Sequence, residues 1–144
     1  MAADERIAAL IPHAGTMCLL ERIAHWDDSS VTLATTTHRH PNNPLATAAG
    51  LRALHLCEYG AQAMAVHGGL TAAARGERAL PGLLVSLRDV VLGCDFVQDL
   101  EGELLVEARR LHESGTAWQY EFRVTHAGKL LAQGRSTVSV APRS

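Results

Sequence analysis

The chain has 144 residues, of which 47% are hydrophobic and 19% are charged, and its formal net charge is −2. That length fits one domain, 1–144, and the composition excludes a disordered chain and a charged coiled coil. The slight negative charge argues against nucleic-acid binding, and no apolar run reaches the ~18 residues of a membrane span. Acidic residues near the N-terminus do not fit a secretory signal, and three widely spaced cysteines suit a reducing compartment, so we expect a cytoplasmic protein.

The first third of the chain alternates short apolar segments with turns. Residues 4–11 predict a short helix that ends before Pro12, because the residue before a proline avoids the helical region. Residues 17–26 and 30–38 predict two strands joined by a polar turn. The stretch 39–44 holds two prolines and two asparagines, which predicts an irregular loop.

One long helix is predicted over residues 51–67, and the adjacent Gly68 and Gly69 predict its end. Apolar residues lie nearly all round this helix, which is typical of a helix buried on most sides. Residues 70–82 then predict a loop.

The remaining residues change to a period of two, which indicates strands. Four strands are predicted over 83–96, 103–113, 118–125 and 129–140, and their short connections favour an antiparallel meander. Two strands, one long helix and four further strands make an α+β fold. We expect a curved antiparallel sheet wrapped around the central helix, with a second subunit over the apolar surface that the sheet leaves uncovered.

Glu58 is the sharpest functional signal. It is the only formally charged residue of the predicted helix beyond Arg52 in the first turn. Burying an unpaired ionised carboxylate in apolar surroundings costs on the order of several kcal/mol. A protonated carboxylic acid in the same place can serve as a general acid near neutral pH. His55 and Gln62 share its helix face. The alternative is a structural or solvent-exposed carboxylate.

Two of the eight histidines are the better candidates for a proton acceptor, because they lie near segments that lead toward the Glu58 helix. His13 follows Pro12, and His40 stands in the Pro/Asn loop. A metal site made of His38, His40 and Glu58 is conceivable, but its spacing matches no strong zinc pattern, and we expect no metal.

Three segments resemble the FabZ-type 3-hydroxyacyl-acyl-carrier-protein dehydratases. Residues 11–22, IPHAGTMCLLER, are similar to that family's opening L-P-H motif, Asn43-Pro44 to the end of its H-F-P-G-N-P loop, and residues 58–63, EYGAQA, to the E-A-x-A-Q-A of its central helix. The divergent dehydratases of aryl-polyene pigment clusters look most similar, since they pair L-P-H-x-G-x-M with an I-E-Y-x-A-Q-A-x-A-x-H-G-G helix. The resemblance implies the hotdog fold.

The same resemblance implies the site. Glu58 matches the family's helix carboxylate, which protonates the departing hydroxyl. The family's loop histidine has no clean match, because alignment on Asn43-Pro44 puts Arg39 at its position, so His13 is the favoured base and His40 the second choice. The remaining substrate-binding residues expected are Gly50 and Leu51 through their backbone amides, Leu54 in an acyl tunnel, and Gln62.

The reaction implied is loss of water from a (3R)-3-hydroxyacyl thioester, and it needs neither a metal nor an organic cofactor. The implied partners are an acyl carrier protein and a second hotdog subunit in a homodimer or heterodimer. Arginines in or near loops (Arg39, Arg52, Arg75, Arg78) can steer an acidic carrier, and the alternative for each is an ordinary solvated side chain. Two alternatives stay open: a non-catalytic subunit that pairs with an active dehydratase, and an acyl-thioesterase that uses Glu58 on water or on the thioester.

Overall fold

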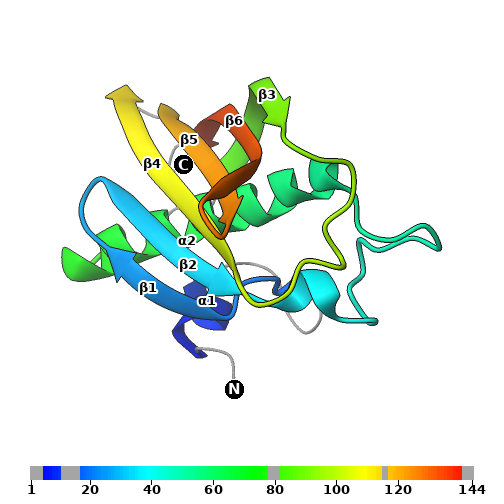
Figure 1. Ribbon diagram of the computed structural model, residues 1–144. Coiled ribbons are helices and arrows are strands. Elements are labelled where there is room, and N and C mark those ends of the chain that lie inside the picture. The colour runs from blue at the N-terminus through cyan, green and yellow to red at the C-terminus, as the bar shows by residue number, and fades with distance from the viewer. Residues whose placement is uncertain (1–4, 11–16, 78–81, 115–116, 141–144) are drawn as a thin grey trace.

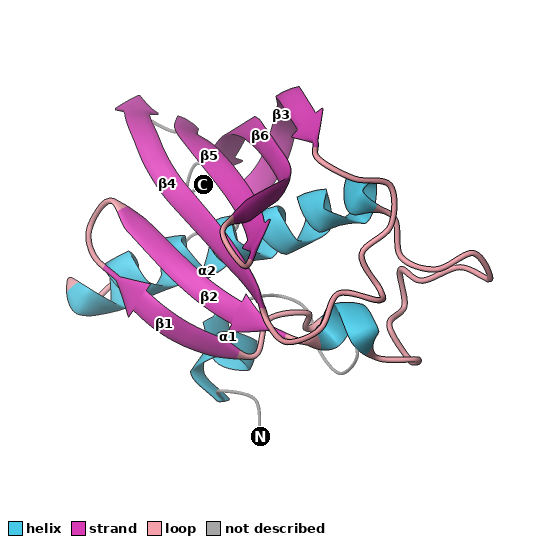
Figure 2. Ribbon diagram, viewed as in Figure 1, coloured by secondary structure: helices cyan, strands magenta, loops and turns pink. Residues whose placement is uncertain are grey.

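The computed structural model describes residues 5–10, 17–77, 82–114 and 117–140. In this part of the chain, six antiparallel strands form one sheet in the order β1-β2-β4-β5-β6-β3, and one long helix packs against it. Figure 1 shows the strands curving over α2, with β1 and β3 at the two edges of the sheet. Figure 2 shows the two layers, with the strands on one side and α2 on the other. The predicted α+β architecture is confirmed.

The bounds of most elements lie close to those predicted from sequence. The helices are α1 (Glu5–Leu10) and α2 (Leu56–Ala74), with short 3-10 turns η2 (Thr37–Arg39) and η3 (Ala53–His55). The strands are β1 (Arg22–Trp26), β2 (Ser30–Thr35), β3 (Gly82–Leu92), β4 (Leu104–Ser114), β5 (Ala117–His126) and β6 (Lys129–Val140). Strand β1 is shorter than expected, because residues 17–20 run irregularly. As shown below, Met17 and Leu19 bond to the side chain of Gln62 on α2, and the carbonyl of Leu19 also accepts from the hydroxyl of Thr35 on β2.

The central helix begins later than predicted because residues 51–53 are held by a distant loop. The amide of Ala53 donates to the carbonyl of Asp95 at 2.8 Å, and that of Val97 donates to the carbonyl of Leu51 at 2.9 Å. This short antiparallel pairing uses backbone groups that a helix would need, so α2 starts only at Leu56.

The prediction that Gly68 and Gly69 end the helix is wrong. Helix α2 continues through both glycines to Ala74. Gly76, just after the helix, has the positive φ of +70° that the C-terminal cap requires. The amides of Gly76 and Glu77 return to the carbonyls of Ala73 and Ala72. Gly69 instead provides room for α1, since a Cβ there would lie 2.7 Å from a methyl group of Leu10.

The predicted four-strand meander is only partly correct. Strands β4, β5 and β6 do follow one another, but β3 pairs with β6 at the far edge and not with β4. The other side of β4 is taken by β2, so the chain must cross from β3 to β4 through residues 93–103. Strand β3 therefore has one side without a strand partner.

The core lies between the sheet and α2. Side chains of α2 such as Leu56, Ala63 and Val66 are fully buried, and they meet the inward faces of β2, β4 and β5. The alternation predicted for β5 is confirmed, since Phe122 and Val124 are fully buried. Burial of this kind contributes roughly 1.5 to 3 kcal/mol for each large side chain.

Candidate functional site

The first two turns of α2 carry the residues on which the sequence prediction centres. Glu58 lies in the first turn, is the only formally charged residue of α2, and is partly buried. The predicted location of this acid, in a mostly apolar helix against the sheet, is confirmed.

Gln62, one turn after Glu58, is 1% exposed, and both ends of its amide are bonded to backbone. Its Oε1 accepts from the amide of Leu19 at 2.9 Å, and its Nε2 donates to the carbonyl of Met17 at 2.6 Å. This side chain therefore holds residues 17–19 against the helix. The expected contact of Gln62 with substrate stays a prediction, and its observed partners belong to the protein itself.

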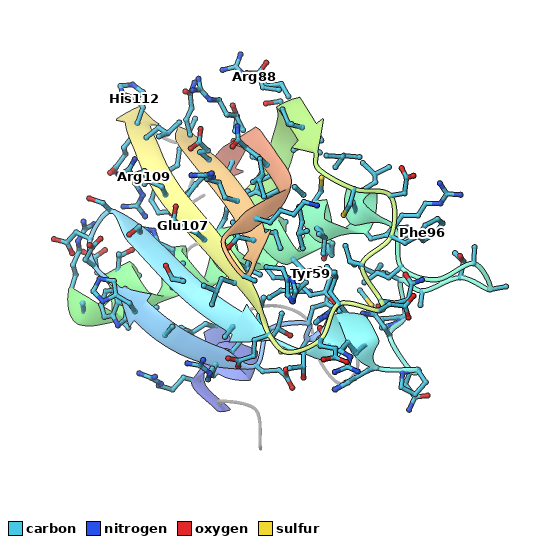
Figure 3. All side chains as sticks on the ribbon, viewed as in Figure 1. Tyr59, Arg88, Phe96, Glu107, Arg109 and His112 are labelled. Atoms are coloured by element: carbon cyan, nitrogen blue, oxygen red, sulfur yellow. The ribbon has the colours of Figure 1, made fainter. Side chains whose placement is uncertain are left out.

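Tyr59, next to Glu58, is fully buried and connects the helix to the loop after β2 (Figure 3). Its hydroxyl accepts from Nδ2 of Asn43 at 2.9 Å and lies 2.8 Å from the hydroxyl of Thr37. Asn43 also donates to the carbonyl of Thr37 and accepts from the amide of Leu45. Burial raises the pKa of Tyr59, so the phenol stays protonated near neutral pH.

The sequence prediction missed Tyr59 and Thr37. Asn43 was recognised only as part of the Asn43-Pro44 motif, without a role. Two features of the sequence could have drawn attention to these residues: the tyrosine that follows the acid, and the polar residues at the end of β2. Neither feature specifies which residues come into contact in the folded protein.

The structure separates the candidate histidines. His40 is exposed, and its side chain makes no hydrogen bond with another described residue. His13 lies outside the described residues, so its role as base stays a prediction. His38 is 1% exposed, and its Nε2–H donates to the carbonyl of Leu100 at 2.8 Å. Burial lowers the pKa of His38, which favours the neutral ring.

The alternative metal site does not form. Within the described ranges, no three His, Cys, Asp or Glu side chains gather closely enough to hold a metal ion. His38, His40 and Glu58 all lie in these ranges, and His38 uses one ring nitrogen on Leu100 while His40 is exposed.

The segment before α2 differs from the expected substrate-binding arrangement. The amide of Gly50 donates to the carbonyl of Thr47 at 2.9 Å, and that of Leu51 donates to Oε1 of Gln98 at 3.0 Å. Both amides therefore have partners, and both precede the helix instead of starting it. Their proposed contact with a thioester requires those bonds to open.

Leu54 and Phe96 are large apolar residues that are exposed beside the start of α2, at 54% and 37% exposure. The guanidinium of Arg52 lies 5.2 Å from the centre of the Phe96 ring, a cation–π contact. Leu54 is open enough to meet a ligand. Of the other loop arginines, Arg39 and Arg75 are exposed, and Arg78 lies outside the described residues.

A second polar cluster lies in the later half of α2, and the sequence prediction did not include it. His67 is fully buried; its Nε2–H donates to the carbonyl of Asp27 at 3.0 Å, and its Nδ1 lies 2.8 Å from the hydroxyl of Tyr120. Arg110 donates to that hydroxyl through Nε and Nη2, and its guanidinium lies 4.2 Å from the centre of the Trp118 ring. Burial lowers the pKa of His67, so this cluster holds a neutral imidazole.

No described helix is both long enough and apolar enough to cross a membrane.

Comparison with known proteins agrees with the sequence resemblance. A model of the ApeP-like family, described as ApeP dehydratase, matches residues 5–143. A search of curated proteins finds no match.

Solved structures with the same arrangement include a chain of the dehydratase heterocomplex ApeI:P from Xenorhabdus doucetiae. It is 24% identical, with a TM-score of 0.83 over 95% of this chain and 91% of that chain. A hypothetical thioesterase protein from Streptococcus pneumoniae, solved with coenzyme A, is 15% identical, with a TM-score of 0.64 over 85% of this chain and 86% of that one. The TT0310 protein from Thermus thermophilus is 19% identical, with a TM-score of 0.59 over 96% and 98% of the two chains. These similarities show the hotdog fold that the resemblance implied.

Proposed function

Because this chain belongs to the ApeP-like dehydratase family, we propose that it removes water from a (3R)-3-hydroxyacyl thioester held on an acyl carrier protein. The product is the trans-2-enoyl thioester. The observation that carries this proposal is Glu58, the one formally charged residue of α2, which is followed by two buried side chains, Tyr59 and Gln62, that tie other segments to the helix. The resemblance to aryl-polyene dehydratases makes a conjugated acyl chain the favoured substrate.

In the proposed reaction, a base removes the proton α to the thioester, the electron pair forms the new C=C bond, and the C–O bond at the β carbon breaks. Protonated Glu58 donates its proton to the departing hydroxyl, so water leaves as a neutral molecule. The base keeps the α-proton until it is returned to solvent or to the Glu58 carboxylate. His13 is the favoured base and His40 the second choice, and no metal or organic cofactor takes part.

We also propose that a second, related hotdog subunit binds along β3. That strand has an open side, and its exposed apolar side chains include Leu87, Val90, Val91 and Leu92 at 36 to 49% exposure. An exposed apolar edge strand is a surface that pairs readily with another chain. A solved relative comes from a heterocomplex, which favours a different partner chain over a second copy of this one.

The carrier protein is the remaining partner of the proposal. An acidic carrier would be attracted to exposed arginines such as Arg39, Arg52 and Arg75. The expected site of action is the cytoplasm, where acyl carrier proteins and reduced cysteines are found together.

The test of the chemistry is Glu58→Gln, measured as hydration of an enoyl thioester by the protein together with its partner subunit. Removing the general acid should lower kcat by about 100- to 10,000-fold, and the melting temperature should stay close to that of the wild type. Glu77→Gln, which changes an exposed carboxylate just after α2, is the matched control and should keep full activity.

Two histidine variants then assign the base. His13→Ala and His40→Ala should differ sharply in rate, with the larger loss in His13→Ala. Equal and mild losses from both would favour the non-catalytic subunit, and hydrolysis with release of free thiol in place of dehydration would favour the thioesterase.

The partner surface has its own test. Val91→Arg places a charge on the open edge of β3, whereas Leu105→Arg places one on β4, at 43% exposure and away from that edge. Val91→Arg should abolish co-purification with the partner, and Leu105→Arg should not. Equal co-purification of both variants would exclude β3 as the interface.

A further inference from the structure

Three segments that are far apart in sequence meet at the backbone of one residue, Leu19. Its amide donates to Oε1 of Gln62 on α2, and its carbonyl accepts from the hydroxyl of Thr37 at 2.7 Å. Thr37 in turn contacts the hydroxyl of Tyr59 on the same helix. Gln62 therefore binds residues 17–19 directly, and Tyr59 is linked to them through Thr37, so the bonds form a closed ring through α2, residues 17–19 and the loop after β2.

The polar groups of this ring share partners with Thr35 on β2. The carbonyl of Leu19 accepts from the hydroxyls of both Thr37 and Thr35, at 2.7 and 2.6 Å, and these two hydroxyls lie 3.0 Å apart. Nδ2 of Asn43 donates both to the oxygen of Tyr59 and to the carbonyl of Thr37. Loss of the Tyr59 hydroxyl therefore removes a link between α2 and the loop after β2, while Asn43 and Thr37 keep their other partners.

The ring is anchored on α2 next to the proposed acid. Tyr59 follows Glu58 directly, and Gln62 lies one helical turn after it, so the clamp and the acid share the first two turns of α2. The loop between Thr37 and Asn43 contains His40, and Met17, which Gln62 also binds, is four residues after His13 in the chain. The segments fixed by the ring are thus those adjoining both candidate bases.

We infer that Tyr59 and Gln62 are positioning residues that set these two segments against the Glu58 helix, an inference that rests on the proposed dehydratase function. The chemical step needs an acid and a base on opposite parts of one substrate, and a misplacement of about 1 Å can cost about 100-fold in rate. Neither side chain needs to touch the substrate to act in this way.

The test compares two buried tyrosines that undergo the same change. Tyr59→Phe removes the hydroxyl in the clamp, and Tyr120→Phe removes the hydroxyl of β5 that bonds to His67 in the later half of α2 and to Arg110 on β4. Tyr59 is 0% and Tyr120 is 1% exposed, so both variants lose a buried hydroxyl of similar environment. Gln62→Met removes both amide bonds of the clamp while keeping a side chain of similar length.

Each variant is assayed with the partner subunit at a temperature well below its own melting transition, and kcat and KM are measured separately. Tyr59→Phe and Gln62→Met should lower kcat by about 100-fold with little change in KM, and Tyr120→Phe should keep a kcat close to wild type although its melting temperature falls. Amide hydrogen exchange at Leu19 should become faster in Gln62→Met and stay unchanged in Tyr120→Phe.

Two results would overturn the inference: wild-type kcat in both clamp variants, or an equal loss of kcat in Tyr120→Phe. Glu58→Gln, assayed beside them, separates this failure from that of the proposed function. If the wild type is active and Glu58→Gln is not, a fully active Tyr59→Phe refutes the clamp alone. If the wild-type complex shows no dehydration, the proposed function fails and the positioning role fails with it.

Discussion

A buried tyrosine hydroxyl lies at each half of α2, that of Tyr59 from the helix itself and that of Tyr120 from β5, and the two make different contacts. In the first half, Tyr59 connects the helix to loop and backbone groups, and a partly buried carboxylate, Glu58, lies beside it. In the later half, Tyr120 joins the side chains of His67 and Arg110 in a network without a carboxylate. A network that fixes loop and backbone segments beside an acid suits chemistry, whereas a network between helix and sheet side chains suits stability.

Two glycines of α2 allow this difference to be tested through packing. A Cβ on Gly60 would lie 2.4 Å from the ring of Phe122, whereas one on Gly68 would lie 3.4 Å from the ring of Trp118. Gly60→Ala should therefore lower the free energy of unfolding by about 1 to 3 kcal/mol through overpacking. Gly68→Ala should leave stability unchanged or raise it by up to about 1 kcal/mol, because alanine favours the helix.

Chemical denaturation of both glycine variants measures these changes. An equal loss of stability in the two would mean that the later half of α2 is packed as tightly as the first.

Arg110 is expected to matter for stability and not for rate. Arg110→Met removes the donors to the hydroxyls of Tyr120 and Thr71 and the contact with Trp118. Leaving buried acceptors without partners should lower the free energy of unfolding by about 1 to 3 kcal/mol. Thermal melting and kcat, measured on the same sample, check this expectation, and a large loss of kcat below the melting transition would contradict it.

The smallest expected effect is a change in pH dependence from His67. Because its folded pKa is lowered by burial, the unfolded chain takes up a proton at His67 more readily than the folded chain does. The stability contribution is fully present above about pH 6.5, the ordinary value of the unfolded side chain, and is lost as the pH falls below it toward the folded pKa. Burial lowers the pKa of His38 too, so it contributes with the same sign.

Melting temperatures of wild type and His67→Gln between about pH 7.5 and 5 measure this contribution. The variant should be less stable at the upper end and should lose less on acidification. His112→Gln, which changes an exposed histidine, should follow the wild-type slope, and a similar flattening in that control would show that burial is not the cause.

The sequence identified several individual residues of the site but not their connections. Glu58 was recognisable because a charge is conspicuous in an apolar helix, and the EYGAQA motif added Gln62. The backbone partners of Gln62 lie 43 and 45 residues away, and the side-chain partners of Tyr59 lie 16 and 22 residues away. Periodicity describes only neighbours along the chain, so it carries no information about contacts of this range.

The helix and strand periodicities, the α+β class and the place of the acid on the central helix could all be predicted from the amino-acid sequence. They follow from local spacing and from the cost of burying charge. The ends of that helix, the strand at the open edge of the sheet and the segments that bind Tyr59 and Gln62 became known only from the folded structure. Residues 51–53 lie outside the helix because a loop 42 to 46 residues further along the chain offers backbone partners, and Gly69 lies within it because α1 packs there. Such choices depend on competition between distant hydrogen bonds and packing contacts, which exists only once the chain has folded.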